Sequence, residues 1–236
     1  MKDKSIEIEQ ISKQISNLKN NFNQSTPIID GIVDLIEYDK ASIKIMWILK
    51  EVNSENDTDE WDLRDAIKNL KTEKGIKKGW ASTFNPIVYT TFGILHNLYW
   101  EEIENTNDNP NIIDVLKKIA YVNVKKIPGK SVAIKSELEI AFKEHKSILK
   151  SQIELYNPDV IICGGTFNII KDVFQNLNNK TAIHPFSSYE NKNTIIIDAY
   201  HPNNRTVTQE KYCNIIIENV IKGNKPTHNK SYKNNA

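Results

Sequence analysis

Four short runs of mostly apolar residues alternate with longer segments that have helical periodicity. The runs cover 43–49, 119–124, 159–163 and 195–200, and they are rich in Ile and Val. Apolar runs of this length are typical of strands that are covered on both faces, as in a parallel sheet. The chain is therefore expected to form a sheet of four mainly parallel strands.

Helical segments are predicted before, between and after these runs. Ile8, Ile11 and Ile15 recur at spacings of three and four, which predicts an amphipathic helix at the N-terminus. The pair Thr26-Pro27 predicts the start of a second helix, and Asn85-Pro86 the start of another. Further helices are expected over 57–70, from Ser131 to Leu149, over 167–174 and over 206–221.

The alternation of strands and helices predicts an α/β fold, a three-layer sandwich with helices on both faces of the sheet. A length of 236 residues with 39% hydrophobic residues suits one domain, which we expect over 1–222. The N-terminal helices would occupy 1–40 and a polar insert 52–83. The Lys- and Asn-rich segment 223–236 is predicted to be a disordered tail.

Composition excludes several classes of protein. The net charge of +1 does not indicate a strongly basic nucleic-acid binder, so any basic surface that binds nucleic acid must be a local patch. The two cysteines, Cys163 and Cys213, lie far apart, which disfavours a disulfide scaffold, a zinc knuckle and a four-cysteine iron–sulfur site. We find no signal peptide and no apolar run of the roughly 18 residues that a membrane span needs. A monomeric cytoplasmic protein without a membrane partner is expected.

Distinctive residues follow each of the four predicted strands. Glu51 comes just after the first, Asn123 ends the second, Gly164-Gly165 follows the third and His201-Pro202 the fourth. Because the carboxyl ends of parallel strands meet at one edge of a sheet, we expect these groups to share one cleft. A second pair, His184-Pro185, lacks a comparable apolar run before it.

These four motifs, in this order, resemble those of the uracil-DNA glycosylase superfamily over about residues 43–221. The segments that carry the resemblance are Lys50-Glu51-Val52-Asn53, Asn123-Val124-Lys125-Lys126, Asn157 to Gly165, and Tyr200-His201-Pro202 with Arg205. Lys50 and Asn53 replace the Gly and Pro of the Gly-Glu-Ala-Pro-Gly motif of one branch, and Asn203 stands where Ser is usual. The cluster cysteines of that branch are absent. The resemblance implies a monofunctional DNA glycosylase without metal or cofactor.

The resemblance also implies a role for each site residue. Glu51 would orient or deprotonate water and stabilise a cationic sugar, and a neutral His201 would donate a hydrogen bond to the departing base. Asn123 would read the pairing edge of the base. Asn53 would line the pocket, and Phe84 or Tyr89 would stack on the base, with Trp61 and Trp80 behind them. DNA contacts are expected from Gly164, Gly165, Thr166, Lys125, Lys126, Lys130 and Arg205.

The target base is less closely defined. One branch excludes thymine with a bulky Tyr against C5 of the pyrimidine, whereas Val52, Asn53 and Ser54 in this loop are smaller. The chain is also similar to a bacterial anti-phage group that excises glucosylated hydroxymethylcytosine from phage DNA. Alternatives are a repair glycosylase for uracil or a damaged base, and a non-catalytic module that binds DNA or a nucleotide. A metal-dependent hydrolase lacks a close ligand pair such as HExxH.

Each site residue has an ordinary structural interpretation as well. Glu51 could be a surface carboxylate, and Asn123 could satisfy loop backbone. The glycine pair could simply turn the chain, and the aromatic residues could belong to the core.

Overall fold

A computed structural model describes residues 2–18, 25–54, 61–180 and 183–223. Its centre is a mixed sheet with the strand order β1-β5-β2-β6-β9-β8-β7, counted over these described ranges. The four inner strands are β5 (Ile119–Asn123), β2 (Ile45–Leu49), β6 (Val160–Gly164) and β9 (Thr194–Ala199). They are mutually parallel, with Ile45 opposite Ile119 on one side and Val160 on the other. The four strands predicted from the apolar runs are confirmed.

The prediction of a four-stranded sheet was wrong because the sheet also has antiparallel edges. β1 (Gly31–Ile32) pairs with β5, while β8 (Ser187–Asn191) pairs with β9 and β7 (Asn178–Asn179) with β8. These edge strands are short or polar, so they lack the apolar run that reveals a buried strand. A separate hairpin joins β3 (Lys71–Thr72) to β4 (Gly75–Ile76).

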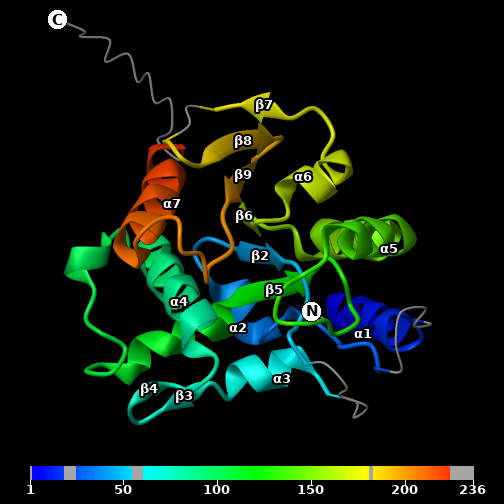
Figure 1. The fold of residues 1–236 in the computed structure, drawn as a ribbon, viewed down its shortest axis with the longest axis horizontal. Helices are drawn as coiled ribbons and strands as arrows, with labels where there is room; N and C mark the ends of the chain where they lie inside the picture. Colours follow the sequence, from blue (N-terminus) through cyan, green and yellow to red (C-terminus); the bar gives the residue numbers. More distant parts are fainter. Residues whose placement is uncertain (1, 19–24, 55–60, 181–182, 224–236) are drawn as a thin grey trace, which may run out of the picture.

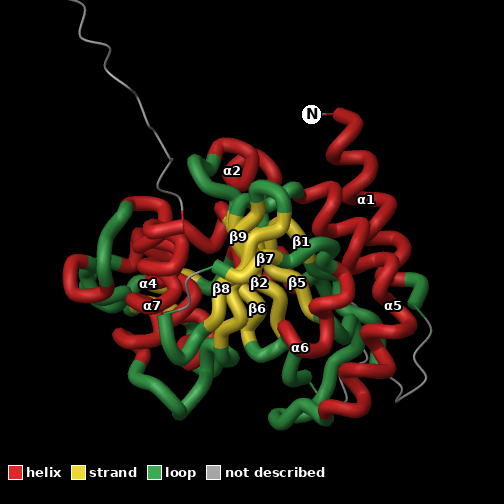
Figure 2. The backbone as a smooth tube through the Cα atoms, turned by 90° about the horizontal axis from the view of Figure 1, so that it is seen from above, coloured by secondary structure: helices red, strands yellow, loops and turns green. Residues whose placement is uncertain are grey.

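Helices cover both faces of the sheet, as Figures 1 and 2 show. On one face lie α3 (Leu63–Lys68), α4 (Ala81–His96) and α7 (Gln209–Gly223), which pack on Trp47, Tyr121 and Ile197. On the other lie α1 (Lys2–Ser16), α5 (Lys135–Tyr156) and α6 (Phe167–Ile170). That face presents Met46 and Val122. Alternate residues of the strands therefore pack into two separate cores, one on each face of the sheet, which confirms the three-layer α/β prediction.

Shorter helical segments connect these layers. They are α2 (Leu35–Lys40) and the 3₁₀ helices η1 (Trp100–Glu102), η2 (Pro110–Lys118) and η3 (Lys171–Val173). The segment from Glu101 to Asn111 therefore begins and ends in 3₁₀ helix. None of the described helices is long and apolar enough to cross a membrane.

Two predicted helix starts were wrong because tertiary pairing overrides the local signal. After Thr26-Pro27 the chain runs extended into β1, and α2 begins only at Leu35, where the Asp34 carboxylate accepts the N–H groups of Ile36 and Glu37. The helix expected from Asn85-Pro86 begins earlier, at Ala81, so that Pro86 lies inside α4. Pro86 has no N–H to donate to the carbonyl of Ser82.

Other boundaries shift by a few residues. Ser131 does not cap α5, which begins at Lys135 after Ile134. The helix expected over 57–70 is α3, capped by Asp62, and residues 55–60 lie outside the described part of the chain. The predicted helix over 167–174 is α6 followed by η3, and the last helix is α7. The predicted tail lies outside the described residues except for Gly223, which ends α7.

Candidate functional site

A cleft of about 590 Å³ opens at the carboxyl ends of β2 and β9. Its walls come from the segment after β2, the start of α4, the segment before α5 and the segment after β9. Its lining includes Lys50, Glu51, Asn53, Trp61, Trp80, Phe84, Tyr121, Lys130, His201 and Asn203. The predicted convergence of a carboxylate and an imidazole at one edge of the sheet is confirmed for Glu51 and His201.

The Glu51 carboxylate is held by both backbone and charge. The chain after β2 continues beside the chain after β5, with Lys125 N–H donating to Lys50 O at 2.9 Å and Gly129 N–H to Val52 O at 2.8 Å. The Oε2 atom of Glu51 lies 2.8 Å from Lys125 Nζ, and the two side chains are only 4% and 2% exposed. Glu51 is therefore not a surface carboxylate. It is a buried, ion-paired group at the wall of the cleft.

His201 presents a defined tautomer. Its Nδ1 accepts the backbone N–H of Asn203 at 3.1 Å, so in the neutral ring the proton resides on Nε2. Burial, together with the charge of Lys50, lowers the pKa of His201 to about 4. The ring is neutral at pH 7 for that reason. It can donate one hydrogen bond from Nε2, as expected for a group that stabilises developing negative charge.

Asn123 ends β5 two residues after Tyr121, so both side chains lie on the face of the sheet that carries α4. Its backbone N–H donates to Asp30 Oδ2 at 2.7 Å. The side chain is buried, and its Oδ1 has no hydrogen-bond partner among the described residues. Asn123 is not among the residues that line the cleft, so the prediction that its amide shares the cleft with Glu51 and His201 was wrong. A buried amide oxygen without a partner costs free energy, so packing alone does not explain why Asn123 occupies this position.

Asp30 belongs to a buried polar cluster behind Asn123. Lys126 Nζ bonds both carboxylate oxygens of Asp30, at 2.7 and 2.9 Å, and the Oε1 of Gln152 at 2.9 Å. Gln152 Nε2 donates to Asp30 Oδ1 at 2.9 Å. The Asp30 and Lys126 side chains are 0% and 1% exposed. This cluster fixes the end of β5 and hence the position of Asn123.

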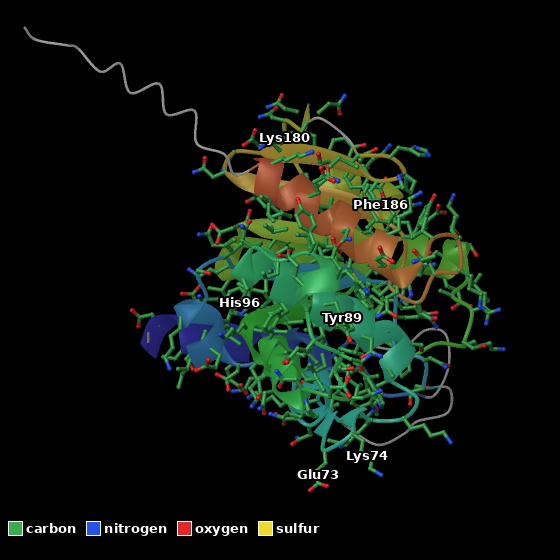
Figure 3. The ribbon with its side chains drawn as sticks, turned by 90° about the vertical axis from the view of Figure 1, so that its left-hand side faces the viewer. Glu73, Lys74, Tyr89, His96, Lys180 and Phe186 are labelled. Atoms are coloured by element: carbon green, nitrogen blue, oxygen red, sulfur yellow. The ribbon has the colours of Figure 1, made fainter. Side chains whose placement is uncertain are left out.

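Aromatic residues form part of the wall, though not as expected. Phe84 lines the cleft but is only 2% exposed, because it stacks on Tyr121 with ring centroids 5.3 Å apart. Trp80 packs on Phe84 and is more open. Tyr89, on α4 (Figure 3), is not brought to the cleft: its hydroxyl accepts the N–H of Thr106 and its ring packs on Trp100.

The predicted DNA contacts divide into buried and exposed residues. Thr166 is buried and donates to Ile48 O at 2.8 Å, and Gly164 is buried as well. The helix that follows has only four residues, which leaves Gly165 as the exposed part of a chain turn. A phosphate site at this turn has no support beyond Gly165.

Lys125 and Lys126, which were expected among the DNA contacts, are instead buried in ion pairs with acidic residues. Burial lowers the pKa of Lys125, but its bonds to Glu137 and Glu51 outweigh burial and leave the pKa raised. Lys130 and Arg205 are exposed, and Lys130 lines the cleft.

Several residues of the cleft wall were not predicted from the sequence. Tyr121 lines the cleft, and its alternation with Asn123 along β5 was the signal that could have found it. Ser82, Thr83 and Ser131 add hydroxyl groups to the wall, and no sequence signal indicated them. Lys50, which departs from the motif of one branch, also lines this cleft.

No protein-family model matches the chain, and no curated protein matches it either. No cluster of three or more His, Cys, Asp or Glu residues that could hold a metal ion occurs within the described ranges.

Proposed function

We propose that the protein is a DNA glycosylase, which takes a base out of the DNA stack and hydrolyses its N-glycosidic bond to leave an abasic site. The observation that carries the proposal is the placement of Glu51 and His201 on one cleft. The first is an ion-paired carboxylate, and the second is a neutral imidazole with its proton on Nε2. Cleavage of an N-glycosidic bond develops positive charge on the sugar and negative charge on the base, and this pair offers a partner for each.

The proposed reaction needs no cofactor. The bond between the sugar C1′ and the base nitrogen breaks, and its electron pair leaves with the base. His201 Nε2–H donates to the base oxygen that becomes negative. Glu51 faces the cationic sugar and orients the water that adds to C1′, a role in which a positioned carboxylate contributes about 10²–10⁴-fold. The hydroxyl of that water stays on C1′, and its other proton ends on the released base.

Asn123 is proposed to read the base, because its buried Oδ1 lacks a partner among the described residues and its side chain lies on the same sheet face as Tyr121, which lines the cleft. An amide both donates and accepts, which suits the pairing edge of a pyrimidine. Extrusion of a base costs a few kcal/mol. Trp61 and Trp80 are half-buried aromatic residues that line the cleft, and they offer surfaces on which a base held there could stack.

We further propose that the base carries a substituent, with glucosylated hydroxymethylcytosine in phage DNA as the leading candidate. The supporting observations are the volume of about 590 Å³, within the usual range of sites for larger ligands, and a wall rich in hydroxyl and amide groups. Val52, Asn53 and Ser54 line the cleft and are smaller than the Tyr with which one branch of the superfamily that the motifs resemble excludes C5 substituents. Uracil or damaged-base repair is the alternative, with the same catalytic residues.

The test is base release from matched DNA duplexes and single strands that contain cytosine, uracil, hydroxymethylcytosine or glucosyl-hydroxymethylcytosine, with a chelator present. Abasic sites are scored as strand breaks after alkali. Breaks that occur only with the glucosylated base are the expected result, and breaks only with uracil would assign the protein to repair. Glu51→Gln and His201→Ala should each lose release while DNA binding persists. Binding without release on any substrate would favour a non-catalytic module.

A further inference from the structure

Lys50 is a charged residue of the cleft that the reaction described above does not use. It is half-buried, directly precedes Glu51 and lines the same wall as His201. A methyl group built on Gly165 would lie 3.3 Å from Lys50 Cε and 3.5 Å from His201 N. The Lys50 side chain and His201 therefore border the same bare glycine, whose φ of +73° also disfavours a side chain there.

Within the described part of the chain, no acidic side chain neutralises the charge of Lys50. Lys125 bonds Glu51 and Glu137, and Lys126 bonds Asp30, whereas Lys50 has no ion-pair partner among the described residues. The ammonium acts on His201, because it is the second cause, after burial, of the lowered pKa of that ring. A half-buried cation beside a hydrogen-bond donor forms an anion site, since both groups favour negative charge in the cleft.

We propose that Lys50 is a further catalytic residue, which contacts the departing base and stabilises its negative charge together with His201. This inference rests on the proposed function. As the bond from C1′ to the base nitrogen breaks, the electron pair moves into the base, and the Lys50 ammonium and His201 Nε2–H share the charge that develops. Lys50 keeps its protons throughout. Water supplies the oxygen at C1′, and a water proton ends on the base.

A DNA phosphate is the other anion that Lys50 could contact. The position of the side chain favours the base, because Lys50 is half-buried between strand ends, whereas Lys130 and Arg205 are exposed. Phosphate contacts and base contacts also differ in their effects. A lysine on phosphate contributes to binding and to its salt dependence, whereas a lysine on the departing base contributes mainly to the rate.

The first test is single-turnover base release by Lys50→Met and Lys50→Arg. Lys143→Met is the matched control, because it removes an exposed lysine of α5 outside the cleft. We expect Lys50→Met to slow release about 10–100-fold with unchanged DNA affinity and salt dependence, and Lys50→Arg to recover part of the rate. An unchanged rate, or weaker binding with a salt slope reduced by about one, would overturn the inference.

The second test does not depend on the correct substrate. Barbiturate, a pyrimidine that is an anion at neutral pH, serves as the probe of the anion site. Its binding is followed through the His201 ring signals in NMR spectra of wild type, Lys50→Met and Lys143→Met. Binding that is lost only in Lys50→Met supports an anion site formed by Lys50 and His201. If no DNA substrate is cleaved as well, the proposed function fails while this anion site stands. No binding to wild type, or equal binding to all three proteins, contradicts it.

Discussion

The carboxylate of Glu51 lies directly against the α-carbon of Gly129. A methyl group built there would come within 2.3 Å of the Cδ and Oε1 atoms of Glu51 and 2.6 Å of Oε2. The carboxylate is the far end of a flexible side chain, so it is the part that would move. Gly129 thus leaves the space in which Glu51 reaches Lys125.

Gly129→Ala is therefore expected to displace the Glu51 carboxylate without removing it. Base release should fall about 100-fold or more, toward the level of Glu51→Gln, because the carboxylate no longer faces the reacting sugar. The free energy of unfolding should change by less than about 1 kcal/mol beyond the effect of Glu51→Gln. Parallel rate and urea-denaturation measurements check both. Full activity in Gly129→Ala would show that the position of Glu51 is not critical.

Asp30→Ala is expected to destabilise the fold strongly. It removes the only acidic partner that the described structure gives to the buried ammonium of Lys126, and a stranded buried charge typically costs about 3–5 kcal/mol. The double variant Asp30→Leu, Lys126→Met removes both charges and should recover most of that loss. Urea denaturation measures the free energies of unfolding. A cost below about 1 kcal/mol for Asp30→Ala would contradict the assignment of this pair as a buried structural cluster.

Asn123→Ala should separate stability from activity. The Oδ1 of Asn123 has no partner in the described structure, so its removal leaves no hydrogen-bond donor unsatisfied and should cost the fold less than about 1 kcal/mol. Base release should nevertheless fall, and discrimination between bases should weaken, because the proposed reader is lost. Thermal unfolding and release from paired substrates provide the measurements. A large loss of stability with unchanged specificity would make Asn123 a structural residue.

The strands and the central pair of the site could be predicted because their signals are local. Each inner strand consists mostly of apolar residues, and Glu51 and His201 come within two residues of the end of such a run. Parallel pairing then brings the two residues to one edge without any knowledge of the helices. The same reasoning places Asn123 at the end of a third run, but it does not place it correctly in the cleft, whose lining lacks this residue.

The burial of Lys125 and Lys126 could not be predicted, because it depends on partners from elsewhere in the chain. Lys125 reaches Glu137, 12 residues away, and Lys126 reaches Asp30, 96 residues away. A lysine is usually exposed, so sequence alone favours a basic rim. The early start of α4 has a similar cause, because contacts with α7, including Cys213 against Pro86 O, stabilise a helix around an internal proline.

His201 should leave a signature in the pH dependence of both stability and activity. Its pKa is about 4 in the folded protein against 6.5 as the ordinary value, so the unfolded chain binds more protons between these limits. The contribution of His201 to the free energy of unfolding should therefore be complete above about pH 6.5. It should be lost as the pH falls toward 4, which lowers the free energy of unfolding by about 1–3 kcal/mol. His201→Gln should flatten this decline in urea denaturation at a series of pH values. His145→Gln is the control for a second buried histidine with a lowered pKa, since it lies on α5 outside the cleft.

In the same pH range, base release by wild type should show no ionisation near pH 6.5 from His201. The contrary result would be a rate that falls as the pH drops, with a midpoint near 6.5, and a pH dependence that disappears only in His201→Gln. It would mean that the ring becomes charged close to neutral pH and does not act as the neutral donor proposed above.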